Sequence, residues 1–164
     1  MKMSEQNHIS TRAFQSSDLI AVKSLIQITI DACYPEVYPE EAVQFFKDWH
    51  CDERVLKDAK EGYTILLHKD TRIVGTGTIV DNHVKRVFVD PAFQRRGFGK
   101  FIMRKLEERA VSTGIDVVKL DASLPSKTFY DSLDYITLER AFLEVENKKR
   151  LDFYRMEKAL VGRV

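Results

Sequence analysis

The sequence has few of the residues and segments that mark membrane, metal-binding or disulfide-rich proteins. Its 164 residues include no apolar run of about 18 residues, the length that a transmembrane helix needs. The segment Met1–Thr11 is polar and lacks the apolar core of a signal peptide. The two cysteines, Cys33 and Cys51, do not have the spacing of metal ligands. A disulfide between them is left as an alternative. The four histidines are scattered. We therefore expect a cytoplasmic protein with no metal site and no membrane segment.

An excess of charge of one sign is also lacking. The chain has 26 Lys and Arg against 25 Asp and Glu, a net charge of +1, so no general attraction to nucleic acid or membranes is expected. Hydrophobic residues make up 44% and charged residues 31%, as in ordinary globular proteins. A chain of this length can bury one substantial core, so we expect residues 1–164 to form a single domain.

The hydrophobic pattern and the turn residues divide the chain into alternating strands and helices. Strands are predicted at residues 9–14, 63–68, 72–80, 84–89, 117–121, 135–145 and 151–160. Helices are predicted to begin at Asp18, as an N-cap, at Pro39 and at Asp52, with a longer one between Gly97 and Gly114 and a short one at 125–133.

This order of elements predicts the fold class. The strand–helix–strand crossover between Val89 and Val117 requires a parallel pair, whereas the hairpins require antiparallel pairs. We therefore expect an α/β (α+β) fold, with a mixed, mostly antiparallel central sheet of about seven strands and helices on both faces.

The segment Val87–Lys100 is the most informative part of the chain. A short β-branched strand is followed by an Asp-Pro turn and then by the start of an amphipathic helix, where unpaired N–H groups attract phosphate. Gly97 and Gly99 lack a Cβ, so a ligand can approach the backbone closely. Three side chains add positive charge, namely Arg95, Arg96 and Lys100. The segment indicates a pyrophosphate-binding loop, although a tight strand-to-helix turn with a basic helix start would give a similar pattern.

The spacing of this segment selects among known phosphate loops. A Walker-type loop needs glycine and Ser or Thr where the chain has Gln94 and Phe101, and a dinucleotide fingerprint needs a third glycine that is missing. The pattern Gln/Arg-x-x-Gly-x-Gly/Ala fits residues 94–99 in full, and this resembles the acetyl-coenzyme A loop of the GCN5-related N-acetyltransferase (GNAT) superfamily. The resemblance implies the GNAT acyl-CoA N-acyltransferase fold over nearly the whole chain, with acetyl-CoA as co-substrate.

The resemblance also implies where acetyl-CoA binds. Strands 84–89 and 117–121 are expected to separate, with the pantetheine arm between them and a main-chain N–H near Val89, in a bulged strand, as the donor for the oxyanion. The implied coenzyme-binding residues are Val87, Phe88, Val89, Gln94, Arg95, Arg96, Gly97, Phe98, Gly99, Lys100 and Ser126.

A second motif supports the resemblance. Residues 125–135 are similar to a family pattern in which a short helix carries Phe-Tyr and ends in Leu-Gly-Phe, but here Asp134 replaces the glycine. Asp adopts the left-handed conformation of a helix end less readily than Gly does. The resemblance places Tyr130 near the coenzyme sulfur, where its hydroxyl can protonate the departing thiolate. The alternative is that Phe129 and Tyr130 are core aromatic residues.

The base and the acceptor pocket are less clearly marked. In many family members an acidic residue lies near the start of the strand before the loop, and here that place holds His83, with Asp81 as the alternative base. His83 could equally be a turn residue. The resemblance implies an acceptor pocket built from the loop between the first two helices and from the last hairpin. The acidic and aromatic side chains there suit a cationic amine, and they are Tyr34, Glu36, Tyr38, Glu40, Glu41, Glu144 and Glu146. These residues could also belong to solvated loops.

We therefore expect an acyl-CoA-dependent N-acetyltransferase that transfers the acetyl group directly to a primary amine of a small molecule. Two alternatives stay open: acetylation of a protein N-terminus or lysine, and a non-catalytic acyl-CoA sensor on the same fold. The expected partners are acetyl-CoA and an amine, without nucleic acid or membrane, and a homodimer is left open.

Overall fold

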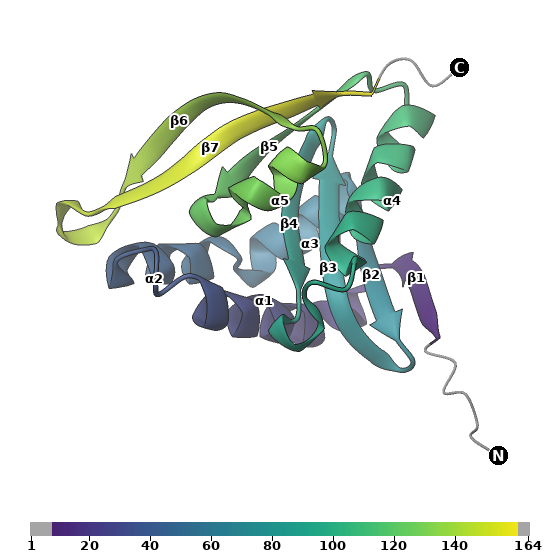
Figure 1. Ribbon diagram of the computed structural model, residues 1–164. Coiled ribbons are helices and arrows are strands. Elements are labelled where there is room, and N and C mark those ends of the chain that lie inside the picture. The colour runs from purple at the N-terminus through teal and green to yellow at the C-terminus, as the bar shows by residue number, and fades with distance from the viewer. Residues whose placement is uncertain (1–7, 161–164) are drawn as a thin grey trace.

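The computed structural model describes residues 8–160, so part of the polar N-terminal segment lies outside the described residues. One seven-stranded sheet has the order β1-β2-β3-β4-β5-β7-β6 (Figure 1). Its strands are β1 Ile9–Ala13, β2 Tyr63–Lys69, β3 Arg72–Val80, β4 His83–Val89, β5 Val117–Ser123, β6 Ile136–Glu144 and β7 Arg150–Ala159. The α-helices are α1 Leu19–Cys33, α2 Glu40–Trp49, α3 Asp52–Glu61, α4 Phe98–Ser112 and α5 Lys127–Ser132.

The predicted elements are present, with one difference at the first helix. Asp18 precedes α1, but its carboxylate makes no cap hydrogen bond to that helix. It accepts hydrogen bonds from Arg12 of β1 (2.8 and 2.7 Å) and from the backbone N–H of Gln15 (2.8 Å). A charge-assisted bidentate partner competes for the carboxylate more strongly than a helix N–H does. Asp18 therefore joins β1 to the start of α1.

The two faces of the sheet are covered by different helices. Helices α1, α2 and α3 cover one face and α4 covers the other (Figure 1). Each face has its own hydrophobic cluster: Ile26, Ile30 and Leu66 belong to the first, whereas Ile102 and Leu106 of α4 belong to the second. The sheet is therefore buried on both sides through its centre, while the β6–β7 hairpin extends beyond the helices.

Two glycines in β3 leave room for the side chain of Ile102 in helix α4. A Cβ on Gly75 would lie 2.7 Å from the side chain of Ile102, and one on Gly77 would lie 2.6 Å from it. Real Cβ atoms do not approach so closely, so larger residues would push α4 away from the sheet. This packing sets the position of the helix and of the loop that leads into it.

Strands β4 and β5 separate along their length. The parallel pair has two registered positions, His83 with Lys119 and Val84 with Leu120. Beyond them the strands diverge, which is the separation that the sequence resemblance implied. Backbone groups in this gap lack a strand partner and are available to a ligand.

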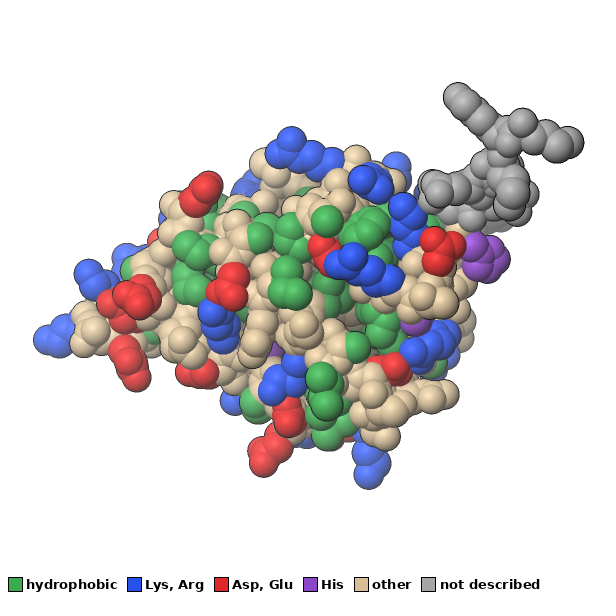
Figure 2. All heavy atoms as spheres, turned by 90° about the horizontal axis from the view of Figure 1, so that it is seen from below, with side chains coloured by type: hydrophobic (Ala, Val, Ile, Leu, Met, Phe, Trp, Pro, Cys, Tyr) green, Lys and Arg blue, Asp and Glu red, His purple; other side chains and the backbone are tan. Residues whose placement is uncertain are grey.

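Within residues 8–160, no helix combines the length and apolar character needed to cross a membrane. On the face in Figure 2, acidic and basic side chains lie interspersed, in keeping with the net charge of +1.

Candidate functional site

Two cavities meet where β4 and β5 separate. The larger, about 710 Å³, lies between the Gln94–Lys100 loop and α5, and we call it the loop cavity. The smaller, about 390 Å³, lies between α2, β4 and the β6–β7 hairpin, and its wall is largely aromatic, so we call it the aromatic cavity. The residues that line both cavities are Tyr34, Val87, Phe88, Ser126 and Tyr130. A group held in one cavity can therefore meet a group held in the other at this junction.

The loop cavity ends at the N-terminus of α4. Gly97 is the N-cap of this helix and has a left-handed backbone (φ 84°), and a Cβ built there would have no atom within 4 Å. No side chain caps the first N–H groups of α4, so they face open space at the loop. Gly99 differs, because a Cβ there would lie 3.0 Å from the ring of Phe129. Gly97 thus leaves room for a ligand, whereas Gly99 allows α5 to pack against the loop.

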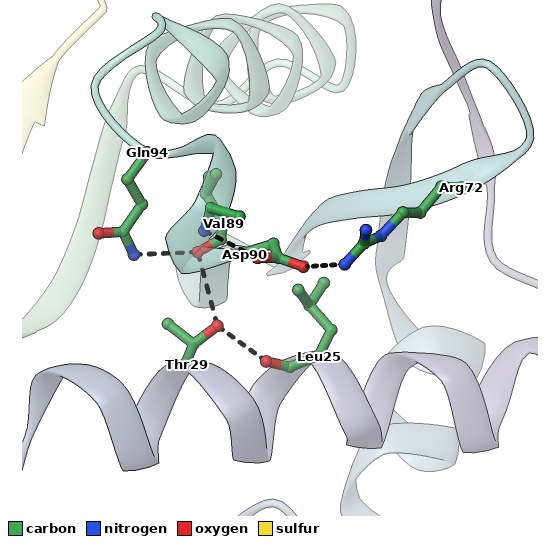
Figure 3. A network of polar contacts seen from close by, with 7 residues as sticks. Leu25, Thr29, Arg72, Val89, Asp90 and Gln94 are labelled. Atoms are coloured by element: carbon green, nitrogen blue, oxygen red, sulfur yellow. Dashed lines mark hydrogen bonds and ion pairs between the residues drawn. The ribbon is translucent and has the colours of Figure 1, made fainter.

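Asp90 fixes the start of the loop. Its carboxylate accepts a hydrogen bond from the backbone N–H of Ala92 (2.9 Å) and pairs with Arg72 of β3 (2.9 Å). Its own N–H donates to the carbonyl of Val74 (2.9 Å). Figure 3 shows Arg72 directed at this carboxylate. The chain therefore leaves the sheet at a defined point, with the predicted Asp-Pro turn in place.

The carbonyl of Val89 is approached by side chains from two other segments. The amide of Gln94 donates to it at 3.0 Å, and the hydroxyl of Thr29 in α1 lies 3.5 Å away while donating to the Leu25 carbonyl (2.8 Å) (Figure 3). Gln94 thus ties the loop back to the end of β4 as well as lining the loop cavity.

The structure brings the predicted coenzyme-binding residues together around the loop cavity, with one exception. All of them line it except Arg96, whose guanidinium lies over the ring of Phe93, 5.4 Å from its centroid. Arg95 and Lys100 line the cavity and are exposed. Ser126 lines both cavities and is hydrogen-bonded to Ser123 (2.6 Å).

The predicted bulge in β4 is present, and its centre is Arg86. Thr78 pairs with Lys85 and Thr76 with Phe88, so β4 has one residue more than β3 over this interval. Arg86 takes up the difference in a left-handed conformation (φ 53°). Because the Asp90 N–H points to β3, alternation directs the N–H groups of Val89 and Val87 away from β3, toward the gap.

Tyr130 lies at the junction of the cavities. It is 7% exposed and its ring packs edge-on against Phe129 and Tyr135, at centroid distances of 5.0 and 5.7 Å. Burial, with a smaller contribution from Tyr34, raises the pKa of the Tyr130 phenol above its usual range, so the group stays protonated at neutral pH. Its hydroxyl makes no hydrogen bond to another residue within 8–160 and remains free to donate.

Tyr34 is a second phenol at the same junction. Burial raises the pKa of Tyr34 to about 12, although a hydrogen bond with Ser123 opposes this. Its ring packs against Tyr38 and Phe46 (5.7 and 4.7 Å). The Tyr38 hydroxyl donates to the Asp152 carbonyl (2.7 Å) and accepts from the Leu124 N–H (2.8 Å), which joins the segment after α1 to β7 and to the end of β5.

The predicted acidic acceptor pocket is not found. Of the seven expected residues only Tyr34 lines the aromatic cavity, and none of the carboxylates Glu36, Glu40, Glu41, Glu144 and Glu146 lines either cavity. Apart from Glu41, which is partly buried, these carboxylates are exposed. An exposed helix start and hairpin tip keep carboxylates hydrated, which costs less than directing them into an aromatic wall.

The two candidate bases lie in different places. His83, exposed at the start of β4, lines the aromatic cavity together with Tyr130. Asp81 does not, because the turn that contains it faces a third cavity beside Arg109. Asp121 of β5 also lines the aromatic cavity, but no motif marks it in the sequence because it lies in an ordinary strand.

A buried polar cluster forms one end of the aromatic cavity. Arg86 donates from Nε to Nδ1 of His50 (3.1 Å) and from a terminal nitrogen to the carboxylate of Asp58, which also pairs with Lys85 (3.6 Å). Burial, and then the positive charges of Arg86 and Arg54, lower the pKa of His50 to about 3. His50 is therefore neutral at physiological pH, with its proton on Nε2, and cannot act as a base through Nδ1.

Metal ligands are not gathered at either cavity. Among residues 8–160, no three His, Cys, Asp or Glu side chains are placed to hold a metal ion. Cys33 and Cys51 are both free, and Cys33 lines the loop cavity with its sulfur 3.7 Å from the Gln94 amide.

Known proteins are similar to this chain over most of its length. The family model for the acetyltransferase (GNAT) domain matches residues 34–160, whereas no curated protein matches the sequence. A GCN5-related N-acetyltransferase from Rhodopseudomonas palustris superposes with a TM-score of 0.85 at 20% identity, over 98% of this chain and 99% of that one. These values show a shared fold and confirm the predicted fold class.

Two further similar structures contain coenzymes. The PaiA N-acetyltransferase from Thermoplasma acidophilum in complex with coenzyme A has a TM-score of 0.70 at 16% identity, covering 93% of this chain and 99% of that one. The structure of yncA from Salmonella typhimurium with its cofactor acetyl-CoA has a TM-score of 0.66 at 16% identity, covering 96% of each chain.

Proposed function

The chain belongs to the GNAT acetyltransferase family, as its loop motif predicted, and from this premise we propose that it transfers an acetyl group from acetyl-CoA directly to a primary amine of a small molecule. The observation that carries the proposal is the junction of the two cavities at Tyr130. A thioester in the loop cavity and an amine in the aromatic cavity meet there without an intermediate carrier on the protein.

The loop cavity fits acetyl-CoA in size and in chemistry. Its volume of about 710 Å³ is that of a cofactor site, and it joins an apolar wall to the uncapped N-terminus of α4. We assign the pyrophosphate to the backbone N–H groups after Gly97, with Arg95 and Lys100 adding charge, and the pantetheine arm to the exposed edge of β4 at Val87 and Val89. When bound, acetyl-CoA supplies the acetyl group as a thioester.

The residues at the junction have complementary roles in the transfer. The amine nitrogen forms a bond to the thioester carbonyl carbon, and the carbon–sulfur bond breaks. The N–H group of Val87, a residue that lines both cavities, stabilises the charge that develops on the carbonyl oxygen. Tyr130 donates its proton to the departing sulfur. Burial raises the pKa of the Tyr130 phenol, and it raises the pKa of the coenzyme thiol in the same way. The proton therefore moves from the phenol to the sulfur between two groups whose pKa values are both raised.

The amine must lose a proton before or during the attack. Neutralising an alkylammonium of pKa about 10.4 at pH 7 costs roughly 4.6 kcal/mol, from 3.4 units at 1.36 kcal/mol each. We assign this proton to His83, directly or through water, because it lines the aromatic cavity. Asp121, on the neighbouring strand of the same cavity, is the second candidate.

The volume of the aromatic cavity favours a small acceptor. About 390 Å³ lies at the lower end of the range for small-molecule sites, and the walls include Phe45 and Trp49 of α2 and Phe153 of β7. A protein N-terminus or a lysine side chain would have to enter this cavity from the surface. The alternative acceptor is tested by including an unstructured peptide among the amines.

Replacing Tyr130 by Phe tests the proposal. The change keeps the ring and removes the hydroxyl, so kcat should fall by roughly 10²–10⁴ while the Kd for acetyl-CoA hardly changes. The rate is followed by release of the coenzyme thiol with a panel of primary amines.

Tyr135→Phe is the matched control. Tyr135 is equally buried, packs against Tyr130 and lines neither cavity, and its hydroxyl has no partner within the described residues. Removing this hydroxyl should leave the rate unchanged. Equal rates for wild type and Tyr130→Phe would show that Tyr130 only packs. Binding of acetyl-CoA without thiol release for any amine would favour a sensor.

A further inference from the structure

The β4 bulge directs two consecutive basic side chains to the same face of the sheet. Along a regular strand, Lys85 and Arg86 would point to opposite faces. The extra residue in β4 removes this alternation, and both side chains reach Asp58 of α3. A left-handed Arg is a strained choice for a strand, so the bulge holds Arg86 in a place that regular pairing would not provide.

Arg86 is a buried cation whose hydrogen-bonding capacity is only partly used. Its residue is 7% exposed and it lines the aromatic cavity. Two of the five N–H donors of its guanidinium have partners, on His50 and Asp58, and the other three have none within residues 8–160. The terminal guanidinium nitrogen that has no partner keeps contact with the open space of the cavity, so a ligand that accepts hydrogen bonds can reach it there.

The charges of the cluster leave a positive excess there. Lys85 and Arg86 carry two positive charges against the single carboxylate of Asp58. His50 adds none, because it is neutral at physiological pH. Asp58 lies behind the cavity wall, whereas the carboxylate that lines the cavity is Asp121 of β5, and the ion pairs of Lys85 and Arg86 are with Asp58. The cavity therefore has a cationic end at Arg86 of β4 and a carboxylate, Asp121, on the neighbouring strand β5.

We propose that the acceptor is an aromatic or apolar amine that also carries a carboxylate, which binds the free donors of Arg86. This inference rests on the proposed acetyl transfer and names its substrate class. The planar guanidinium matches a carboxylate in two parallel hydrogen bonds, and the apolar body of the acceptor packs against Phe45, Phe46 and Trp49. Arg86 is thus a residue that determines specificity.

Matched pairs of amines test the proposal on the wild-type protein. L-phenylalanine is compared with L-phenylalaninamide, and para-aminomethylbenzoate with its amide, so that two separations of amine and carboxylate are sampled. Values of kcat/KM are expressed per free amine, because an amide changes the pKa of a neighbouring amino group. We expect the acid to exceed its amide by about tenfold or more in at least one pair. Equal values in both pairs would overturn the proposal.

Variants then assign the preference to Arg86. In Arg86→Gln the ratio of acid to amide should fall about tenfold, and a partly unfolded sample would not change this ratio because both substrates see the same protein. Arg54→Gln removes one guanidinium that stacks on Trp49 but does not line the cavity, and its ratio should stay within about twofold of wild type. A preference that survives in Arg86→Gln would contradict the assignment.

A binding measurement separates this inference from the proposed reaction. Calorimetry with L-phenylalanine and its amide needs no turnover. If no amine releases thiol, but L-phenylalanine binds about tenfold more tightly than its amide and Arg86→Gln removes the difference, the carboxylate site stands and the acetyl transfer fails. If thiol is released and neither binding nor rate distinguishes acid from amide, the transfer stands and the carboxylate site is overturned.

Discussion

His50 should make the stability of the protein depend on pH. Its pKa is lowered to about 3, first by burial and then by the charges of Arg86 and Arg54, whereas in the unfolded chain it should be near 6.5. Between these values the unfolded state binds a proton that the folded state does not bind. The stability contributed by neutral His50 is therefore present above pH 6.5 and is lost as the pH falls toward 3.

The size of the effect follows from the two pKa values. At pH 4.5 the protonated form of His50 outnumbers the neutral form by about a hundredfold in the unfolded chain, whereas His50 in the folded protein is almost wholly neutral. The free energy of unfolding should then be lower than at pH 7.5 by about 2.7 kcal/mol, from RT ln(101/1.03). A folded pKa of 4 in place of 3 would change this figure by about 0.1 kcal/mol.

Urea unfolding at pH 7.5 and 4.5 measures this contribution by comparison with His50→Asn. The Asn side-chain oxygen can accept the hydrogen bond from Arg86 that Nδ1 accepts now, but it does not titrate. Other titrating groups act in both proteins and cancel in the difference. The wild type should lose about 2.7 kcal/mol more than the variant on acidification. Equal losses in the two proteins would show that His50 is not held neutral by the cluster.

Three further changes test other parts of the account. Gly97→Glu should weaken acetyl-CoA binding by about tenfold or more, measured by calorimetry, whereas Gly114→Glu, at an equally left-handed and open position at the other end of α4, should not; equal affinities would remove the loop assignment. His83→Ala should lower the rate most at neutral pH and recover partly at high pH, where free amine is plentiful; a profile parallel to wild type would point to Asp121. Gly77→Ala should lower the free energy of unfolding by about 1–3 kcal/mol through the clash with Ile102, and an unchanged urea midpoint would contradict the close packing of α4.

The fold could be predicted because its signals are local. Pro39 and Gly114 mark a helix start and a helix end that the structure places at the same residues. Asp134 has the left-handed backbone (φ 70°) that its position at the end of α5 requires, although the related pattern has glycine there. The parallel pairing of β4 with β5 could be predicted because the two strands are joined by a long helical crossover, the kind of connection that parallel strands need.

The acceptor side could not be predicted because its residues are distant in sequence. His50, Asp58 and Arg86 come from the end of α2, from α3 and from a bulge in β4, and none belongs to a motif. The bulge itself depends on how β3 and β4 align, which periodicity does not reveal. The expected carboxylates, Glu40 among them, were inferred from the segments that build the acceptor pocket in the related family, and none of them lines either cavity.

A single-turnover experiment tests the central claim most directly. The protein is loaded with less than one equivalent of acetyl-CoA, and thiol, acetylated amine and intact protein mass are followed before and after an excess of amine is added. Direct transfer predicts no thiol release and no gain in protein mass before the amine, and then one acetylated amine for each thiol. An acetyl group on the protein before the amine is added, above all on Cys33 in the loop cavity, would contradict direct transfer.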